Sequence, residues 1–217
     1  MRSSLLRLSV LILTTLCGCQ TSAQREYQTM KAGNETAAAE MRACVSTVYS
    51  SPEYTPLRAH LPYNVADATL QQLADASMIT PREWEAILAI HPKVQQCRNT
   101  LLAALAKSTP SIVPILTQVY NRSEDDLLAL SAHKLTWGQY VVRARDRSAE
   151  AQAALQAEGQ RVVDRLQREN AIEIEQRQRA AEALAAWAQT QELINAANRP
   201  VITNCSGMAN TVNCVSH

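Results

Sequence analysis

The histidines and cysteines have the widest chemical repertoire in this chain, because they can bind metals or act as nucleophiles and acid–base groups. The sequence contains four histidines and six cysteines. It has no His-Glu-x-x-His pattern, no Cys/His pattern at zinc-finger spacing and no Cys-x-x-Cys redox pair. We therefore expect no metal and no cofactor. Unless His60 and His133 meet in space, we expect surface or hydrogen-bonded roles for His60, His91, His133 and His217.

The carboxylates and serines form no catalytic pattern either. Glu83 and Glu85, like Glu173 and Glu175, are two residues apart and so point to different sides of a helix. No Gly-x-Ser-x-Gly sequence is present to hold a hydrolase nucleophile on a sharp turn. The sequence predicts a protein without catalytic activity, since an enzyme would have to assemble its acid and base from residues distant in the chain.

Composition excludes two further classes of function. The 217 residues include 21 basic and 20 acidic side chains, a formal net charge of +1. Such a balanced chain lacks the clustered Lys and Arg that neutralise phosphates, so nucleic acid is not an expected partner. Only five glycines are present, which argues against a glycine-rich nucleotide-binding fold.

The N-terminal residues have the pattern of an export signal. Arg2 and Arg7 precede an apolar run over residues 8–16. This run has the length of a signal-peptide core, whereas a membrane-spanning helix needs about 20 residues. No second long apolar stretch follows in the sequence.

The sequence Leu16-Cys17-Gly18-Cys19 resembles the lipobox of bacterial lipoprotein precursors, with Leu three positions before the modified cysteine and small Gly18 directly before it. The resemblance implies that residues 1–18 are a signal peptide, and that Cys19 receives a diacylglycerol thioether and an N-acyl chain. Cys17 is the poorer candidate, because bulky Leu16 would then lie at the cleavage site. An ordinary secretory signal or a short buried helix is the alternative.

The residue after the modified cysteine bears on location. In such lipoproteins an Asp at this position retains the protein in the inner membrane, and here the residue is Gln20. The resemblance therefore implies an outer-membrane protein that faces the periplasm. Several acyl chains on one residue would anchor it stably.

The remaining cysteines predict disulfides. Four thiols in an oxidising compartment indicate two bridges, with three connectivities. Two of the cysteines lie on apolar stripes of separate expected helices, and the other two are close together near the C-terminus. We expect one bridge to join the helices and one to close a local loop, with four reduced thiols as the alternative: Cys44–Cys97 and Cys205–Cys214.

Apolar residues at helical spacing predict helices through most of the chain after residue 33. Capping boxes mark two helix starts, at Thr80-Pro81-Arg82-Glu83 and at Thr136-Trp137-Gly138-Gln139. We expect the first of these helices to kink or break at Pro92. Ser123 is expected to cap a further short helix, with acidic residues 124–126 in its first turn.

The interval from Trp137 to about residue 198 contains no proline and predicts one very long helix, or two helices broken near Gly159. Trp137 is expected to be a core anchor. Between residues 143 and 182 arginines and acids are interspersed, as is typical of a solvated helix stabilised by i,i+4 ion pairs. The apolar residues do not keep a clean seven-residue spacing over three or four heptads, so a coiled coil is the less favoured interpretation.

The C-terminal residues change character. Two β-branched runs, at 201–205 and 211–215, flank a short connection and predict a hairpin. This ending resembles a cysteine-bracketed terminal segment of small bacterial envelope proteins. In addition, Leu135-Thr136-Trp137-Gly138-Gln139-Tyr140 resembles a group of helical periplasmic proteins in which Thr-Trp-Gly begins the last helix.

The expected fold is mainly α: a small disulfide-stapled helical bundle with one very long C-terminal helix and a terminal disulfide-closed β-hairpin. The expected segments are a signal peptide (1–18), a lipidated tether (19–33), a helical domain (34–135), a long charged helix (136–198) and the hairpin tail (200–217).

The expected function is that of a lipid-anchored structural or interaction protein of the cell envelope, attached to the membrane through Cys19. The far end of the long helix needs something to cover it, which is another protein, the terminal hairpin or a second copy of this chain. The alternative is a helical binding module that captures a small ligand or inhibits an envelope enzyme. The apolar residues that require cover are Leu184, Trp187, Leu193 and Ile194.

Overall fold

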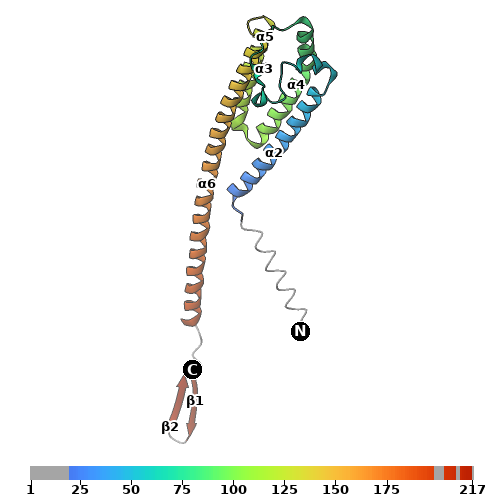
Figure 1. Cartoon of the computed structure of the whole chain (residues 1–217). Coiled ribbons are helices and arrows are strands. Elements are labelled where there is room, and N and C mark those ends of the chain that lie inside the picture. Colours follow the sequence, from blue (N-terminus) through green and yellow to red (C-terminus); the bar gives the residue numbers. More distant parts are fainter. Residues whose placement is uncertain (1–19, 198–202, 209–210, 217) are drawn as a thin grey trace. The chain divides into compact units, whose positions relative to one another are not determined.

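A computed structural model describes residues 20–197, 203–208 and 211–216, the last two ranges by their backbone alone. The described chain is mainly helical, as the sequence predicts (Figure 1). The expected signal peptide and Cys19 lie outside the described residues. The chain divides into two compact units, one ending at Asn170 and the other beginning at Ala171. The long helices are α2 (Ser22–Tyr49), α4 (Pro81–Ser108), α5 (Val113–Ser131) and α6 (Trp137–Ala197).

Helix α2 begins at Ser22, so the polar segment expected to form a tether or a frayed helix start is helical from that residue. Thr21 caps the helix: its hydroxyl accepts from the Gln24 backbone N–H at 3.2 Å, and the Gln24 side chain accepts from the Thr21 N–H at 3.1 Å. This reciprocal box satisfies two backbone donors that a helix start otherwise leaves unpaired. The polar composition of residues 20–33 therefore marks a partly exposed helix, not an irregular tether.

Helices α2 and α4 lie side by side in the first unit (Figure 1). Cys44 and Cys97 form a disulfide between them, with their Cα atoms 5.8 Å apart, which confirms the expected bridge. Gly33 permits close approach further along, because a Cβ added there would lie 2.8 Å from Cβ of Ser108. A covalent bond thus joins the two helices, and Gly33 leaves room for them to pack closely.

The connection between α2 and α4 contains short elements that close one end of the core. They are η2 (Pro52–Leu57), η3 (Val65–Asp67) and α3 (Leu70–Leu73). Tyr54 and Leu57 of η2 are buried, and they join residues of α2, α4, α5 and α6 in one hydrophobic cluster. The proline-rich connection between α2 and α4 therefore contributes buried side chains to the core.

Pro92 does not interrupt α4, which runs unbroken from Pro81 to Ser108 and so corrects the expectation of a break. A proline inside a helix removes one hydrogen bond and costs about 3 kcal/mol. Here Ile90 and Cys97 are buried on either side of it, and the disulfide fixes the later part of the helix. Tertiary packing on both sides of Pro92 outweighs the local penalty.

The expected helix start at Ser123 is also wrong, since α5 is continuous from Val113 to Ser131 after a single 3₁₀ turn, η4 (Pro110–Ile112). Ser123 is buried within the helix. The acidic residues after it do not face the positive end of a helix dipole. Glu124 instead pairs with α4 and Asp126 pairs with α6, as described below. Residue types that are typical of a helix cap here contact the neighbouring helices instead.

Helix α6 begins as predicted, with Thr136 and Gln139 forming the expected capping box. Trp137 is fully buried, which confirms it as a core anchor. The helix continues through Gly159 without a break. The segment before α4 binds the first turn of α6. The N–H of Trp137 donates to the carbonyl of Ser77 at 3.0 Å, and the N–H of Gly138 donates to the carbonyl of Asp75 at 2.8 Å.

In the second unit, β1 (Thr203–Met208) and β2 (Thr211–Ser216) form an antiparallel pair. The backbone register places Cys205 opposite Cys214. The side chains of both residues lie outside the described part of the chain, so the second expected disulfide stays a prediction.

Candidate functional site

His60 lies at the centre of a polar cluster that the sequence does not reveal. Its Nδ1 is 2.6 Å from Oδ2 of Asp75, and its Nε2 is 2.9 Å from Oε1 of Glu83. The ring stacks on Trp137 with the centroids 4.8 Å apart, and Trp137 Nε1 donates to Oε2 of Glu83 at 3.3 Å. Ionised carboxylates only accept hydrogen bonds, and each ring nitrogen of His60 lies within hydrogen-bond distance of one such acceptor.

The two carboxylates of this cluster have depressed pKa values. Burial acts to raise the pKa of Asp75, but hydrogen bonds from the side chain and backbone of Ser77 and from His60 lower it further than burial raises it. Burial likewise opposes ionisation of Glu83, and hydrogen bonds from Thr80 and Trp137, together with His60, bring its pKa below the ordinary value. Both groups are therefore held as carboxylates, and their contacts join the η2–α3 connection, the α3–α4 connection, α4 and α6.

The depressed pKa values predict a loss of stability in acid. A carboxylate whose pKa is lower in the folded than in the unfolded chain stabilises the fold above its unfolded pKa, and this contribution disappears as the pH falls through the folded pKa. With ordinary values of 3.8 for Asp75 and 4.5 for Glu83, the loss begins below about pH 4.5. Urea unfolding at a series of pH values should show the free energy of unfolding falling in this range.

A pair of variants separates the contribution of Glu83 to this acid dependence from that of the other acidic residues. Glu83→Gln should flatten the acid part of the profile, because the residue no longer titrates. Glu85→Gln is the matched control, since Glu85 is exposed on the same helix. Equal acid slopes for wild type and Glu83→Gln would contradict the assignment.

Glu124 of α5 is the centre of a second cluster, which faces α4. Its carboxylate binds His91 and Arg98 and accepts from Gln95 Nε2 at 3.0 Å. Burial raises the pKa of Glu124, but hydrogen bonds from His91 and Arg98 lower it by more. Arg98 also lies over the ring of Tyr120, 4.7 Å from the centroid, a cation–π arrangement. Every polar group of the cluster is engaged by another residue of the fold.

Asp126 lies two residues further along α5 and faces α6 instead of α4. Its carboxylate pairs with Arg147 and, at 3.1 Å, with Arg143, both on α6. Asp126 and Arg147 are largely buried, with side-chain exposures of 12% and 10%. Acidic residues at 124 and 126 therefore connect α5 to α4 on one side and to α6 on the other. The three polar clusters position helices, and the residues around Asp126, Arg143 and Arg147 also line an open groove of about 320 Å³.

The described residues offer no metal centre. No group of three His, Cys, Asp or Glu side chains among them is arranged to hold a metal ion. An internal cavity of about 120 Å³ lies between α2, η2, α4, α5 and α6, with Tyr54, His91 and Tyr140 among its lining residues. Ligand pockets are usually about 300–1,000 Å³, so this cavity suits a few water molecules and not an organic ligand.

Two shallow grooves follow the contact of α2 with α6 in the first unit. One of about 300 Å³ is lined by Ala23, Tyr27 and Leu166, and one of about 390 Å³ by Met30, Leu155 and Val162 among others. Asn170 marks the end of this contact, where its Oδ1 accepts a hydrogen bond from Thr21 Oγ1 at 2.6 Å. The start of α2 is thus attached to α6 immediately after the expected lipid anchor.

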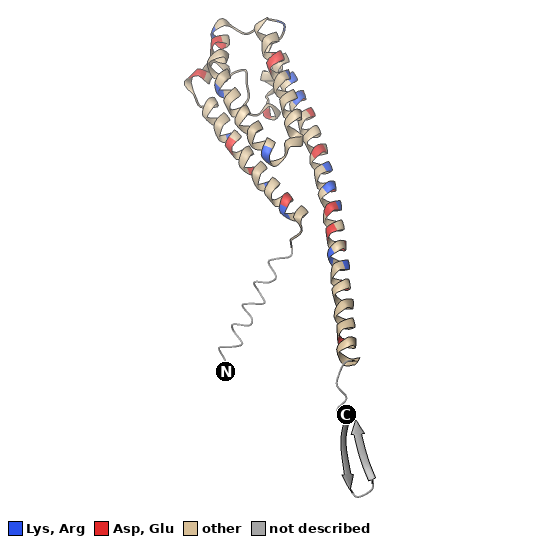
Figure 2. Cartoon of the chain, turned by 180° about the vertical axis from the view of Figure 1, so that it is seen from behind, with Lys and Arg blue, Asp and Glu red and all other residues tan. Residues whose placement is uncertain are grey.

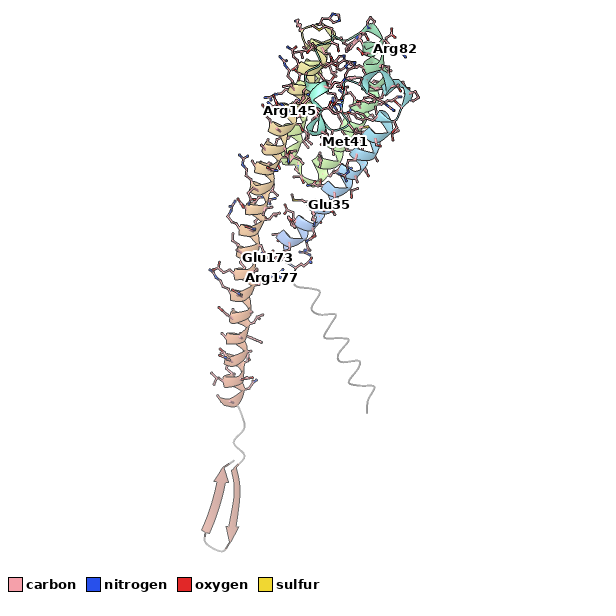
Figure 3. All side chains as sticks on the ribbon, in the orientation of Figure 1. Glu35, Met41, Arg82, Arg145, Glu173 and Arg177 are labelled. Atoms are coloured by element: carbon pink, nitrogen blue, oxygen red, sulfur yellow. A yellow bond between two sulfur atoms is a disulfide. The ribbon has the colours of Figure 1, made fainter. Side chains whose placement is uncertain are left out.

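The second unit exposes large apolar side chains on α6. Ion pairs along the helix, Glu173 with Arg177 and Glu175 with Arg179, precede them (Figure 3). Beyond these pairs the coloured residues give way to an almost uniformly tan ribbon (Figure 2). The expected partner residues have exposed fractions of 67%, 63%, 72% and 45%: Leu184, Trp187, Leu193 and Ile194.

The structure therefore brings together one of the two predicted cysteine pairs and leaves the predicted partner residues uncovered within the described chain. Sequence reasoning missed the three polar clusters. Among residues 20–197, no helix has a stretch apolar enough to cross a bilayer.

Comparison with known proteins adds no relative: no family model, no curated protein and no solved structure matches the chain.

Proposed function

We propose that the protein is a lipid-anchored, periplasm-facing component of the bacterial outer membrane, which acts as a structural or protein-interaction element without catalysis. The observation that carries the proposal is the lipobox-like sequence ending at Cys19, followed three residues later by a capped helix. A lipid on Cys19 would be joined almost directly to α2, so the helical body would be held close to the membrane surface.

The disulfide between Cys44 and Cys97 supports export. Disulfides persist in oxidising compartments such as the periplasm and are rare in the cytosol. The pairing is also independent of the signal sequence, because both cysteines lie in the folded body. Two separate features of the chain thus favour the same compartment.

The exposed apolar end of α6 supports an interaction role. Large apolar side chains gathered at one end of an otherwise charged helix are typical of a surface that binds something. The alternative, capture of a small ligand within the helical body, has less support, because the cavity there is about 120 Å³.

Metabolic labelling tests the lipid anchor. The full chain, expressed with its own signal in a diderm bacterium fed radiolabelled palmitate, should incorporate label. Cys19→Ala should abolish the label and leave the signal uncleaved, because the modified residue is lost. Cys17→Ala is the matched control and should be labelled like wild type, since Cys17 is removed with the signal. Label that persists in Cys19→Ala would overturn the proposal.

Membrane fractionation tests the location. Wild type should sediment with outer-membrane vesicles on a sucrose gradient, and Gln20→Asp should shift the protein to the inner-membrane fraction. The control Gln24→Asp changes the same residue type within α2 and should leave the distribution unchanged. Wild-type protein in the inner membrane would contradict the outer-membrane assignment.

A further inference from the structure

Three exposed apolar side chains of the second unit, Leu184, Trp187 and Ile194, fit a heptad pattern over a limited range, whereas Leu193 lies off it. Ala180, Leu184, Trp187, Gln191 and Ile194 recur at intervals of four, three, four and three residues, the spacing of a coiled-coil seam. Leu184, Trp187 and Ile194 are all exposed, so this seam is uncovered in the described chain. We call these five residues the C-terminal seam.

The same heptad frame, counted back along the sequence, falls on an interface that the chain already makes. It passes through Val163, Leu166 and Asn170. Leu166 is only 5% exposed, Val163 and Leu166 line the groove against α2, and Asn170 binds Thr21. In the first unit this face of α6 therefore packs against a helix.

The frame then crosses a charged segment before the C-terminal seam begins. Glu173 and Arg177 occupy its next two positions and pair with each other at 2.5 Å. The ion-paired segment separates the part of the face that packs on α2 from the part that has no helix against it in the described residues.

The charges around the C-terminal seam favour a second copy of the same chain. The positions that flank it are small and uncharged: Ala181, Ala183, Ala188, Thr190 and Asn195. Charged flanks normally select the partner of a coiled coil and repel an identical helix where like charges meet. Glu182 and Glu192 are the only charges between residues 180 and 197, and both lie off the seam and its flanks. The surface can thus meet its own copy without repulsion.

We infer that the C-terminal seam pairs with that of a second copy, as a short parallel coiled coil between two membrane-anchored chains. This inference rests on the proposed function, because a seam of about two heptads is short for stable association in free solution. Lipid anchors would confine both copies to one membrane face, align them in the same direction and raise their effective concentration.

Photocrosslinking in the cell tests the pairing. The full chain carries benzoylphenylalanine either at Leu184, within the seam, or at Gln189, on the opposite side of the helix. In a parallel pair, position 184 faces its own copy. Irradiation should give an adduct of twice the monomer mass from position 184, at least five-fold stronger than from position 189.

Charge variants with a matched control sharpen the test. With the crosslinker at 184, Trp187→Glu combined with Ile194→Glu should reduce the dimer adduct at least five-fold. Ala185→Glu combined with Gln189→Glu adds the same charge away from the seam and should change it less than two-fold. All these positions are exposed, so helical content measured by circular dichroism should stay constant.

The outcomes separate this inference from the proposed function. An adduct of position 184 with a different protein would overturn self-pairing and still support an interaction role. An adduct within one chain, or none at all from a protein that is labelled with palmitate, would overturn the inference while the lipid anchor stands. Absence of palmitate label would overturn the proposed function itself.

Discussion

Replacing both Cys44 and Cys97 by alanine should lower the free energy of unfolding by about 4 kcal/mol, the value expected for opening a loop of 53 residues. The bridge limits the freedom of the unfolded chain, because it ties the later part of α2 to the middle of α4. In the folded protein it also fills a site in the core, where Cys97 is only 1% exposed. Because native domains are stable by only about 5–15 kcal/mol, this loss is a large part of the total.

Urea unfolding followed by far-ultraviolet circular dichroism measures the effect. Cys205→Ala with Cys214→Ala is the control: these residues belong to the second unit, so the transition of the first unit should keep its midpoint. A loss of less than about 1 kcal/mol in the Cys44/Cys97 variant would mean that the bridge adds little to the fold.

Gly138→Ala is expected to be nearly as damaging, although it adds only one methyl group. A Cβ at this position would lie 2.6 Å from the carbonyl oxygen of Leu73 and 2.7 Å from that of Asp75. Both are backbone atoms, so rotation of a side chain cannot relieve the clash. The start of α6 would have to move away from the segment that accepts its first N–H groups. We expect a loss of about 3 kcal/mol, the upper end of the usual cost of overpacking.

Gly159→Ala provides the matched comparison within the same helix. No atom lies within 4 Å of a Cβ added there, so the substitution meets open space. Glycine in a helix interior is about 1 kcal/mol less favourable than alanine, and the variant should therefore be as stable as wild type or up to about 1 kcal/mol more stable. Thermal unfolding of the two variants side by side should give shifts of opposite sign. Similar shifts would contradict the packing described at Gly138.

Local sequence patterns predicted those parts of the fold that depend on neighbours in the chain. The capping boxes at Thr80 and Thr136 are confirmed, because a box needs only four consecutive residues. The Cys44–Cys97 bridge was predictable because each cysteine lies on the apolar stripe of its own helix. Trp137 was predictable as a core residue from its size and its place at a helix start.

Two of the errors share one physical cause, which is that tertiary contacts overrode local preference. Pro92 remains inside α4 because buried residues on both sides hold the helix. Ser123 resembles a cap, yet α5 continues through it because Glu124 and Asp126 find cationic partners on two other helices. The early start of α2 has a local cause instead, because Thr21 and Gln24 form a capping box within the polar segment.

The polar cluster around His60 was beyond prediction for a different reason. Its members come from four separate positions, and the side chain of Trp137 reaches Glu83 across 54 residues of sequence. No spacing rule connects such residues in a single sequence. Glu83 did carry a signal, but as part of a capping box, and its contacts with His60 and Trp137 use the same carboxylate for a second purpose.

The central claim is that Cys19 carries the lipid that holds this helical protein on the outer membrane, and the N-terminal peptide of protein purified from membranes tests it most directly. Mass spectrometry should find a peptide that begins at Cys19 and carries a diacylglycerol group and an N-acyl chain. An unmodified peptide that includes residue 19, or one that still begins at Met1, would contradict the claim.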